Sequence, residues 1–237
     1  LATSLLSCLA AFTLAEVLIT LGIIGVVAAM TMPSLIANYQ KQQVVTQLKR
    51  EYNVISNALR AAQEDNGDTE EWELGNVGTI QSASDFVDNY LLPYLTVLKE
   101  CGTDTSGECA YEYIYLNSSS TSSLANYTRF ILNDGAMVFV STESNTVFPK
   151  LIYINIDING NKKPNKVGKD YFSFAVALET TEDRFKPTGR LNASGQSQAR
   201  EAILSDAYNG CSRNKTGLFC AALIIKDGWT ISKDYPW

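Results

Sequence analysis

The amino-terminal part of the chain is an almost uninterrupted apolar run that carries one charged side chain. Up to residue 40 this charged residue is Glu16, and the first basic residue is Lys41. As a helix, residues 14–32 would span about 28 Å, which is close to the hydrocarbon thickness of a bilayer. We therefore expect a transmembrane helix rather than a secretory signal peptide, which has a basic start and a shorter apolar centre.

After this run the pattern becomes one-sided. Apolar residues recur at spacings of three and four, at Val45, Leu48, Tyr52, Ile55, Leu59 and Ala62. This spacing predicts an amphipathic helix that reaches about residue 65 and ends at Gly67, a suitable C-cap. Because the stripe is shorter than three heptads, we expect it to lie on the chain's own sheet rather than on a coiled-coil partner.

Strand-like patterns follow in the second half of the chain. Runs rich in aromatic and β-branched residues occur at 111–116, 127–132, 136–140, 151–158 and 171–178. Their composition and the turn residues between them predict strands. Asn133-Asp134-Gly135 fits a tight hairpin between the second and third of these runs.

Helical patterns frame the predicted strands. An apolar-periodic piece at 84–95 predicts a short helix stopped by Pro93, and two more helices are expected at about 197–207 and 217–226. The sequence therefore predicts an α+β fold, in which a long amino-terminal helix packs on an antiparallel sheet and short helices follow near the carboxy terminus.

The five cysteines are Cys8 in the apolar run and two close pairs. Neither pair has the C-x-x-C spacing of a redox or zinc site, so disulfides are the better interpretation. Four cysteines allow three connectivities, and sequence proximity favours Cys101–Cys109 and Cys211–Cys220. Such bonds imply an oxidising compartment.

Composition excludes several functions. Histidine is absent, which removes histidine-based triads and histidine zinc sites. The net charge of −6 argues against broad nucleic-acid binding. No P-loop, dinucleotide or G-x-S-x-G motif occurs, and the Ser-x-x-Lys and Lys-Thr-Gly strings at 212–217 share Lys215, which fits chance. We expect no enzyme activity and no required cofactor.

The apolar run also carries a family signature. "AFTLAEVLITLGIIGVVAAMTMP" resembles the amino-terminal signature of type IV pilins and type II secretion pseudopilins. In that family a prepilin peptidase cuts before a Phe and methylates the new amine, which implies a cut between Ala11 and Phe12. The family's glutamate corresponds to Glu16, and its helix-bending proline to Pro33.

The resemblance implies a division of the chain into a leader (1–11), a transmembrane half (12–35) and an amphipathic half (36–66) of one helix, and an extracytoplasmic α+β domain (67–237) of the pilin-like fold. It implies that Glu16 neutralises the terminal amine of a neighbouring subunit as that subunit leaves the membrane. The acid is then an assembly device, because removing one partner of a buried ion pair costs about 3–5 kcal/mol.

One loop offers oxygen ligands. Asp157, Asn159, Asn165 and Asp170 lie within a Gly/Pro-rich stretch, and the resemblance makes calcium a candidate ligand, because some pseudopilins bind it in a late loop. Gly160 comes too early for an EF-hand, and Lys162, Lys163, Lys166 and Lys169 crowd the loop with positive charge. A hydrogen-bonded connection between strands is therefore favoured over a calcium site at Asp157, Asn159 and Asp170.

The resemblance implies a structural subunit of a type IV pilus or type II secretion filament. It would be held in the bacterial inner membrane by one span, with its carboxy-terminal domain extracytoplasmic, and then enter a periplasmic or cell-surface filament. Implied partners are homologous subunits, prepilin peptidase, an inner-membrane assembly platform and membrane lipid, with no nucleic acid. The sequence leaves open which machine is served.

Two alternatives remain at this point. The chain could be a membrane-anchored extracytoplasmic binding or adhesion module that never polymerises. It could also be an anchored hydrolase that uses carboxylates, although no pair of acids stands out in the sequence.

Overall fold

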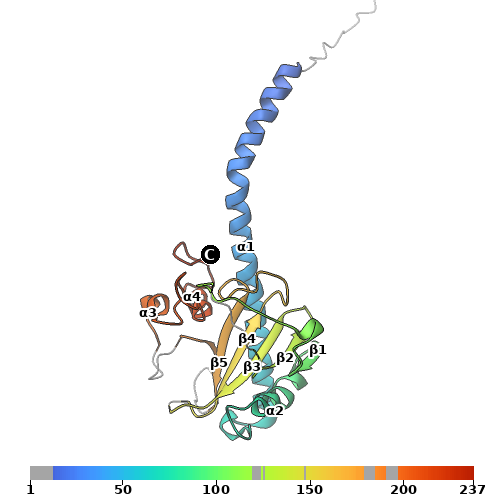
Figure 1. Ribbon diagram of the computed structural model, residues 1–237, viewed down its shortest axis with the longest axis vertical. Coiled ribbons are helices and arrows are strands. Elements are labelled where there is room, and N and C mark those ends of the chain that lie inside the picture. The colour runs from blue at the N-terminus through green and yellow to red at the C-terminus, as the bar shows by residue number, and fades with distance from the viewer. Residues whose placement is uncertain (1–12, 119–123, 125, 147, 179–184, 191–196) are drawn as a thin grey trace, which may run out of the picture. The chain divides into compact units, whose positions relative to one another are not determined.

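Helix α1 (Leu14–Asn66) contains both the apolar run and the amphipathic stripe. The computed structural model describes residues 13–118, 124, 126–146, 148–178, 185–190 and 197–237 (Figure 1). It divides into two compact units, residues 1–41 and residues 42–237.

In the first unit, the residues of α1 up to Lys41 form an exposed apolar helix. Leu14 and Met30 are each 76% exposed, and Leu35 is 69% exposed. In the second unit, α1 turns a buried face toward the domain, made of Leu48, Glu51, Ile55, Ala58, Leu59 and Ala62. The predicted docking of the stripe on the chain's own domain is confirmed.

The predicted end of α1 is also confirmed. The amide of Gly67 donates to the carbonyl of Gln63 at 3.0 Å. Gly67 adopts a φ of +77°, which a residue without Cβ tolerates at low cost.

The sheet has six antiparallel strands in sequential order. They are β1 (Val97–Gly102), β2 (Thr128–Leu132), β3 (Met137–Glu143), β4 (Leu151–Asp157), β5 (Tyr171–Ala177) and β6 (Phe185–Pro187). Four of the five predicted strands are therefore confirmed. The predicted hairpin is confirmed as well, because Gly135 donates its amide to the carbonyl of Leu132 at 2.9 Å between β2 and β3.

The prediction of a strand at 111–116 is wrong. Residues 111–116 lie across the face of the sheet opposite α1, which we call the outer face. Tyr111 and Tyr113 are buried there, and Ile114 makes an isolated bridge to Lys166. Its aromatic residues reflect packing onto the sheet rather than pairing within it.

The edge strands β1 and β6 were not predicted. β1 has register shifts between Val97 and Lys99 and between Glu100 and Gly102, and its sequence places Val97 beside Leu98 and Lys99 beside Glu100, so apolar and polar residues do not alternate. β6 is three residues long and includes Pro187, which is typical of an edge position.

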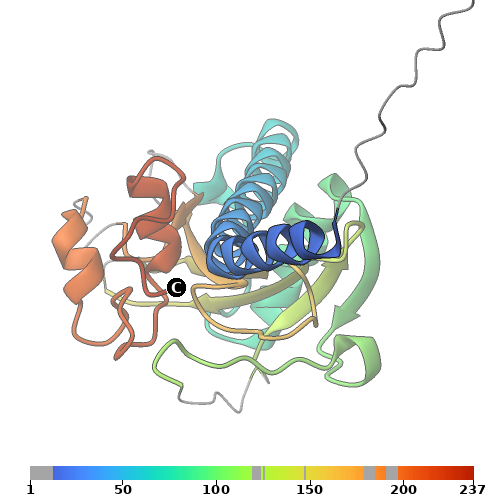
Figure 2. The same ribbon diagram turned by 90° about the horizontal axis from the view of Figure 1, so that it is seen from above.

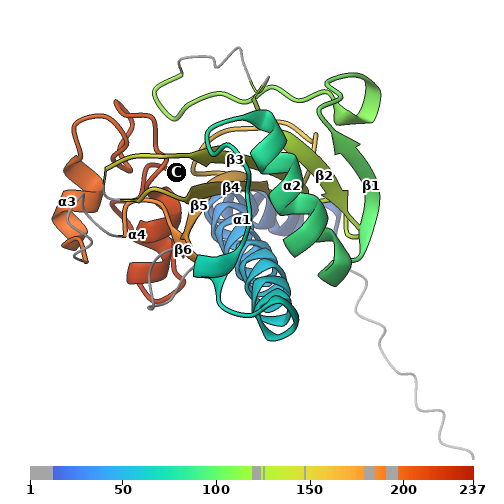
Figure 3. The ribbon, with the colours of Figure 1, turned by 90° about the horizontal axis from the view of Figure 1, so that it is seen from below.

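One face of the sheet packs against α1, α2 (Ile80–Tyr90) and α4 (Cys220–Lys226) in the main core. Figure 3 shows α1 and α4 on one side of the sheet and the connection between β1 and β2 on the other. The helix predicted at 84–95 begins earlier, because Thr79 caps α2 by accepting from the amide of Ser82 at 3.2 Å. It ends before Pro93. The predicted carboxy-terminal helices exist but are shorter, as α3 (Arg200–Ser205) and α4.

The opposite face is covered by the connection between β1 and β2, as the view from above also shows (Figure 2). Here Tyr113 stacks on Tyr171 with ring centroids 4.3 Å apart, and Tyr111 contacts Phe139. Arg129 is 2% exposed and donates to the carbonyl of Leu124 at 2.6 Å. The sheet is thus buried on both faces over most of its length.

Both predicted disulfides are confirmed. Cys101–Cys109 links the end of β1 to the 3-10 turn at Gly107–Cys109, and Cys211–Cys220 links the loop after α3 to the start of α4. Each closes a small loop, with sequence separations of 8 and 9. The bonds indicate an oxidising compartment.

Candidate functional site

The apolar half of α1 is the first candidate site. Among the described residues, α1 is the one helix long and apolar enough to cross a membrane, and none of its most apolar window is buried. Hydroxyl side chains in this part bond back to helix carbonyls, as Thr20 does to Val17 at 3.0 Å and Thr31 to Val27 at 2.9 Å. Such bonds satisfy polar groups without water, so the helix is compatible with a membrane span or a signal anchor.

Glu16 lies in the first turn of this helix. Its Oε2 accepts from the backbone amide of Thr13 at 2.8 Å and from the Thr13 hydroxyl at 2.7 Å. The Thr13 hydroxyl in turn accepts from the amide of Glu16 at 3.2 Å. These reciprocal bonds form a capping box, in which Thr13 is the N-cap and Glu16 the third helical residue.

The capping box gives Glu16 a role within its own chain, which the sequence analysis missed although the Thr-x-x-Glu spacing shows it. Pro33 lies inside α1, as the pilin resemblance implies. The predicted processing residues Ala11 and Phe12 lie outside the described residues, and so does Cys8.

The loop between β4 and β5 is the second candidate site. It brings Asp157, Asn159 and Asp170 together, as the calcium hypothesis requires. The hydroxyl of Tyr111 donates to Oδ2 of Asp157, and the amide of Asn159 donates to Oδ1 of the same carboxyl at 3.0 Å.

Asp170 accepts two further backbone bonds, from the amide of Asn165 at 2.9 Å and from the amide of Lys166. Asn165 adopts a left-handed φ of +47° and donates its Nδ2 to the carbonyl of Glu112 at 3.1 Å. These bonds hold the loop against the segment over the outer face.

Burial dominates the electrostatics of this pair. It raises the pKa of Asp157 to about 7, with the nearby charge of Asp170 adding to the rise and the bond from Tyr111 opposing it. Burial likewise raises the pKa of Asp170, against the lowering effect of its backbone bonds. Burial and mutual repulsion thus act in the same direction on Asp157, against the hydrogen bonds that it accepts.

Within the described ranges, no three or more Cys, Asp or Glu side chains are grouped so as to hold a metal ion. The oxygens of Asp157 and Asp170 serve the hydrogen bonds that fix the loop, which fits the favoured interpretation as a connection between strands. Calcium binding by this loop stays a prediction.

A third cluster was missed by the sequence analysis. Glu51 on α1 is fully buried, and the neighbouring Arg50 pairs with it at 2.6 Å and with Asp134 of the β2–β3 turn at 2.5 Å. Burial raises the pKa of Glu51 to about 7, and the nearby Asp134 carboxyl also raises it. Glu51 lies three residues after Leu48 and four before Ile55, a spacing that places it on the apolar face of the helix.

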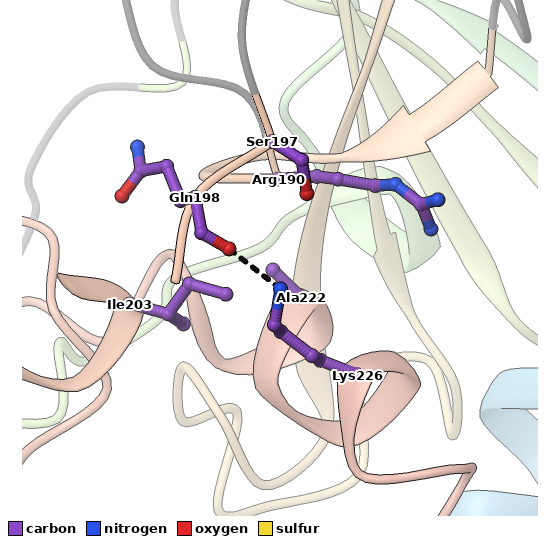
Figure 4. A pocket seen from close by; sticks show the side chains of 6 residues that line it. All are labelled: Arg190, Ser197, Gln198, Ile203, Ala222 and Lys226. Carbon is purple, nitrogen blue, oxygen red and sulfur yellow. Dashed lines mark hydrogen bonds between the residues drawn. The ribbon is translucent and has the colours of Figure 1, made fainter. Parts of the chain in front are cut away.

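A pocket of about 180 Å³ lies near α4 and is lined by Arg190, Ser197, Gln198, Ile203, Ala222 and Lys226. In Figure 4, Lys226 donates to the carbonyl of Gln198, at 2.6 Å, while Arg190 extends away from it. The volume is below the roughly 300–1,000 Å³ typical of small-molecule sites. The pocket therefore supports no ligand assignment.

No curated protein and no solved structure matches the chain. A family model does match, over residues 34–237, which is most of the chain and includes the whole second unit. The protein therefore belongs to the family described as a family of unknown function, DUF6613.

Proposed function

We propose that the chain is a structural subunit of the pilin or pseudopilin type, with a pilin-like fold, that assembles through its amino-terminal helix. One observation carries the proposal: α1 combines an exposed, membrane-length apolar half with a half whose buried face packs in an α+β domain. An anchor alone does not require this combination, whereas a subunit that moves from lipid into a filament of like helices uses both halves.

The apolar half supports the proposal in a second way. Gly22 and Gly25 lie on α1, and a Cβ built at either position would meet no atom within 4 Å. Small residues let helix backbones approach each other closely in lipid or in a bundle. The side chains that lipid covers before assembly would be covered by neighbouring helices afterwards.

In this proposal the subunit enters the inner membrane with its disulfide-bonded domain on the extracytoplasmic side. A prepilin peptidase then cuts between Ala11 and Phe12, and an assembly platform extracts the mature chain. Glu16 meets the new amine of a neighbouring subunit, which offsets the cost of a carboxylate in an apolar surrounding, at least about 2.5–3.5 kcal/mol on insertion scales.

Processing provides the first test. Mature protein, isolated from cells with an active prepilin peptidase, should begin at Phe12 and carry a methylated amine. Amino-terminal sequencing and intact mass measure both properties. Mature protein that retains residues 1–11 in such cells would contradict the proposal.

The second test separates the two roles of Glu16. In Glu16→Gln the amide oxygen can still accept the Thr13 bonds, so the capping box remains while the negative charge is lost. We expect this variant to lose filament assembly, as measured by electron microscopy and by the sheared surface fraction.

Thr13→Ala is the matched control, because it removes the capping hydroxyl and keeps the charge. We expect it to assemble, with a cost of about 1 kcal/mol to the helix start. Correct processing is checked in both variants by amino-terminal sequencing. If Glu16→Gln assembles as well as the unchanged protein, the anchored binding or adhesion module becomes the better function.

A further inference from the structure

The two ends of the sheet in the second unit carry opposite charge. The turn from β4 to β5 contains Lys162, Lys163, Lys166 and Lys169, and we call it the lysine turn. The segment from the end of α1 into the following 3-10 turn contains Glu64, Asp65, Asp68, Glu70, Glu71 and Glu73, and we call it the acidic end. Residues 61–74 contain no basic residue, and Lys150 reaches this end from the residue before β4.

The contacts place the two segments at opposite ends of the same strands. The lysine turn follows Asp157, the last residue of β4. The acidic end lies beside the first residues of β4, because Lys150 donates to the carbonyl of Glu70 at 2.9 Å and Thr69 donates to the carbonyl of Leu178 at 2.9 Å. The seven residues of β4 separate the two by about 20 Å.

Both segments are held in place by the domain. In the lysine turn, Ile114 donates to the carbonyl of Asn165 at 2.8 Å, and Val167 donates to the carbonyl of Ile114 at 3.0 Å. At the acidic end, the Trp72 ring is 2% exposed and stacks on Tyr90 with centroids 4.1 Å apart. Charges on such fixed backbones need little further ordering when a partner binds.

The lysines are available for a partner. Lys162 and Lys163 are exposed, while Lys166 and Lys169 are half-buried and Lys169 lies over the ring of Trp237. Ion pairs in the described part of the chain involve Arg50, Lys99 and Arg200, and none joins a lysine of the turn to a carboxylate. Glu70, Glu71 and Glu73 are exposed at the other end.

We propose that the lysine turn of one copy binds the acidic end of the next copy, so that domains stack end to end. The inference rests on the proposed function, in which the α1 helices of neighbouring copies are parallel. Parallel copies bring the lysine turn of one copy toward the acidic end of the next. Such a head-to-tail contact repeats without closing into a ring. The opposite charges of the two segments make a second copy a complementary partner, and the fixed positions of the charges set the register.

Zero-length carbodiimide cross-linking of the full chain, in detergent and in filaments, tests the contact. We expect amide bonds between the lysine turn and the acidic end, identified by mass spectrometry. These bonds must join two chains, because the segments are too far apart within one. They should weaken with added salt, since exposed charges are screened over about 10 Å at 0.1 M.

Charge reversal makes the test specific. Lys162→Glu with Lys163→Glu should lower the cross-link yield of the remaining lysines, Lys166 and Lys169, roughly tenfold, because like charges then meet. Glu70→Lys with Glu71→Lys should do the same to the cross-links of the remaining acids. The chain with all four substitutions should cross-link with itself again but not with the unchanged protein. Lys226→Glu with Lys233→Glu makes the same change of net charge elsewhere and should have no effect.

The outcomes separate this inference from the proposed function. Filaments without these cross-links, or a fourfold variant that fails to restore them, would overturn the end-to-end contact and leave the filament proposal standing. An anionic lipid surface is the alternative partner of the lysine turn, and vesicles with and without phosphatidylglycerol test it. Protection of its lysines from acylation by the anionic lipid alone, without cross-links between chains, would also overturn the contact.

Discussion

At the scale of single residues, two carboxyls show how burial decides charge. Glu51 and Asp157 are fully buried, and burial raises the pKa of each to about 7. Each carboxyl has a fixed donor, Arg50 for Glu51 and Tyr111 for Asp157, yet desolvation outweighs these bonds. The folded domain therefore binds protons that the unfolded chain would release near neutral pH.

This property predicts how stability depends on pH. The pKa of Glu51 rises from an ordinary 4.5 to about 7 on folding, so its contribution is fully present below pH 4.5 and is lost as the pH rises through 7. The loss is roughly 3 kcal/mol in the free energy of unfolding, at about 1.4 kcal/mol per unit of pKa.

Glu51→Gln should remove this loss, because the amide does not titrate. Urea unfolding of the full chain in detergent, followed by tryptophan fluorescence between pH 4 and pH 8, measures it. The free energy of unfolding of Glu51→Gln should exceed that of the unchanged protein by a gain that grows with pH. A gain that stays the same at all pH values would show that Glu51 does not titrate in this range.

At the scale of elements, the two halves of α1 differ in burial. Ile55 is fully buried in the second unit, whereas Ile23 is 60% exposed in the first. Ile55→Ala should lower the free energy of unfolding of the domain by about 2–5 kcal/mol through the lost burial and the cavity. Ile23→Ala should change it by less than about 0.5 kcal/mol, as exposed substitutions do.

The same urea unfolding experiment compares the two variants. Equal effects would mean that the apolar half of the helix packs in the domain. A large effect of Ile55→Ala alone would agree with two halves that serve different surroundings.

The elements also show what the sequence could predict. Features set by neighbours in the chain were predicted correctly: the one-sided stripe of α1, the C-cap at Gly67 and the Asn133–Gly135 turn. The segment around Tyr111 was misread, because an aromatic side chain is buried equally well in a strand and in a segment that lies across a sheet. The edge strands were missed because apolar and polar residues do not alternate along the β1 sequence, and because β6 is three residues long and ends in Pro187.

Among the candidate sites, contacts between distant segments were beyond the sequence. Arg50 meets Asp134 only because α1 packs beside the β2–β3 turn, and no local pattern links them. The two disulfides were predictable because each closes a short loop. The capping box at Thr13 and Glu16 was predictable from spacing, yet Glu16 was noticed only as a lone charge in an apolar run and as the family's glutamate.

At the scale of the whole molecule, the charge distribution matters more than the net charge. A chain with a net charge of −6 would repel its copies if the charges were spread evenly. Here the basic side chains of the lysine turn and the acids of the acidic end lie at opposite ends of β4. In the proposed filament, this separation brings the lysine turn of one copy near the acidic end of the next. The two segments attract each other although the net charges of the copies repel.

The two edges of the sheet limit how the molecule can associate. Register shifts distort β1, which also carries Lys99 and Glu100, and β6 offers three residues that include a proline. Neither edge strand offers a long, regular row of free backbone groups with which another strand could pair. Copies that lie close together are therefore protected from amyloid-like growth. In the proposed filament, where many copies lie close together, neighbouring domains would therefore not join through their sheet edges.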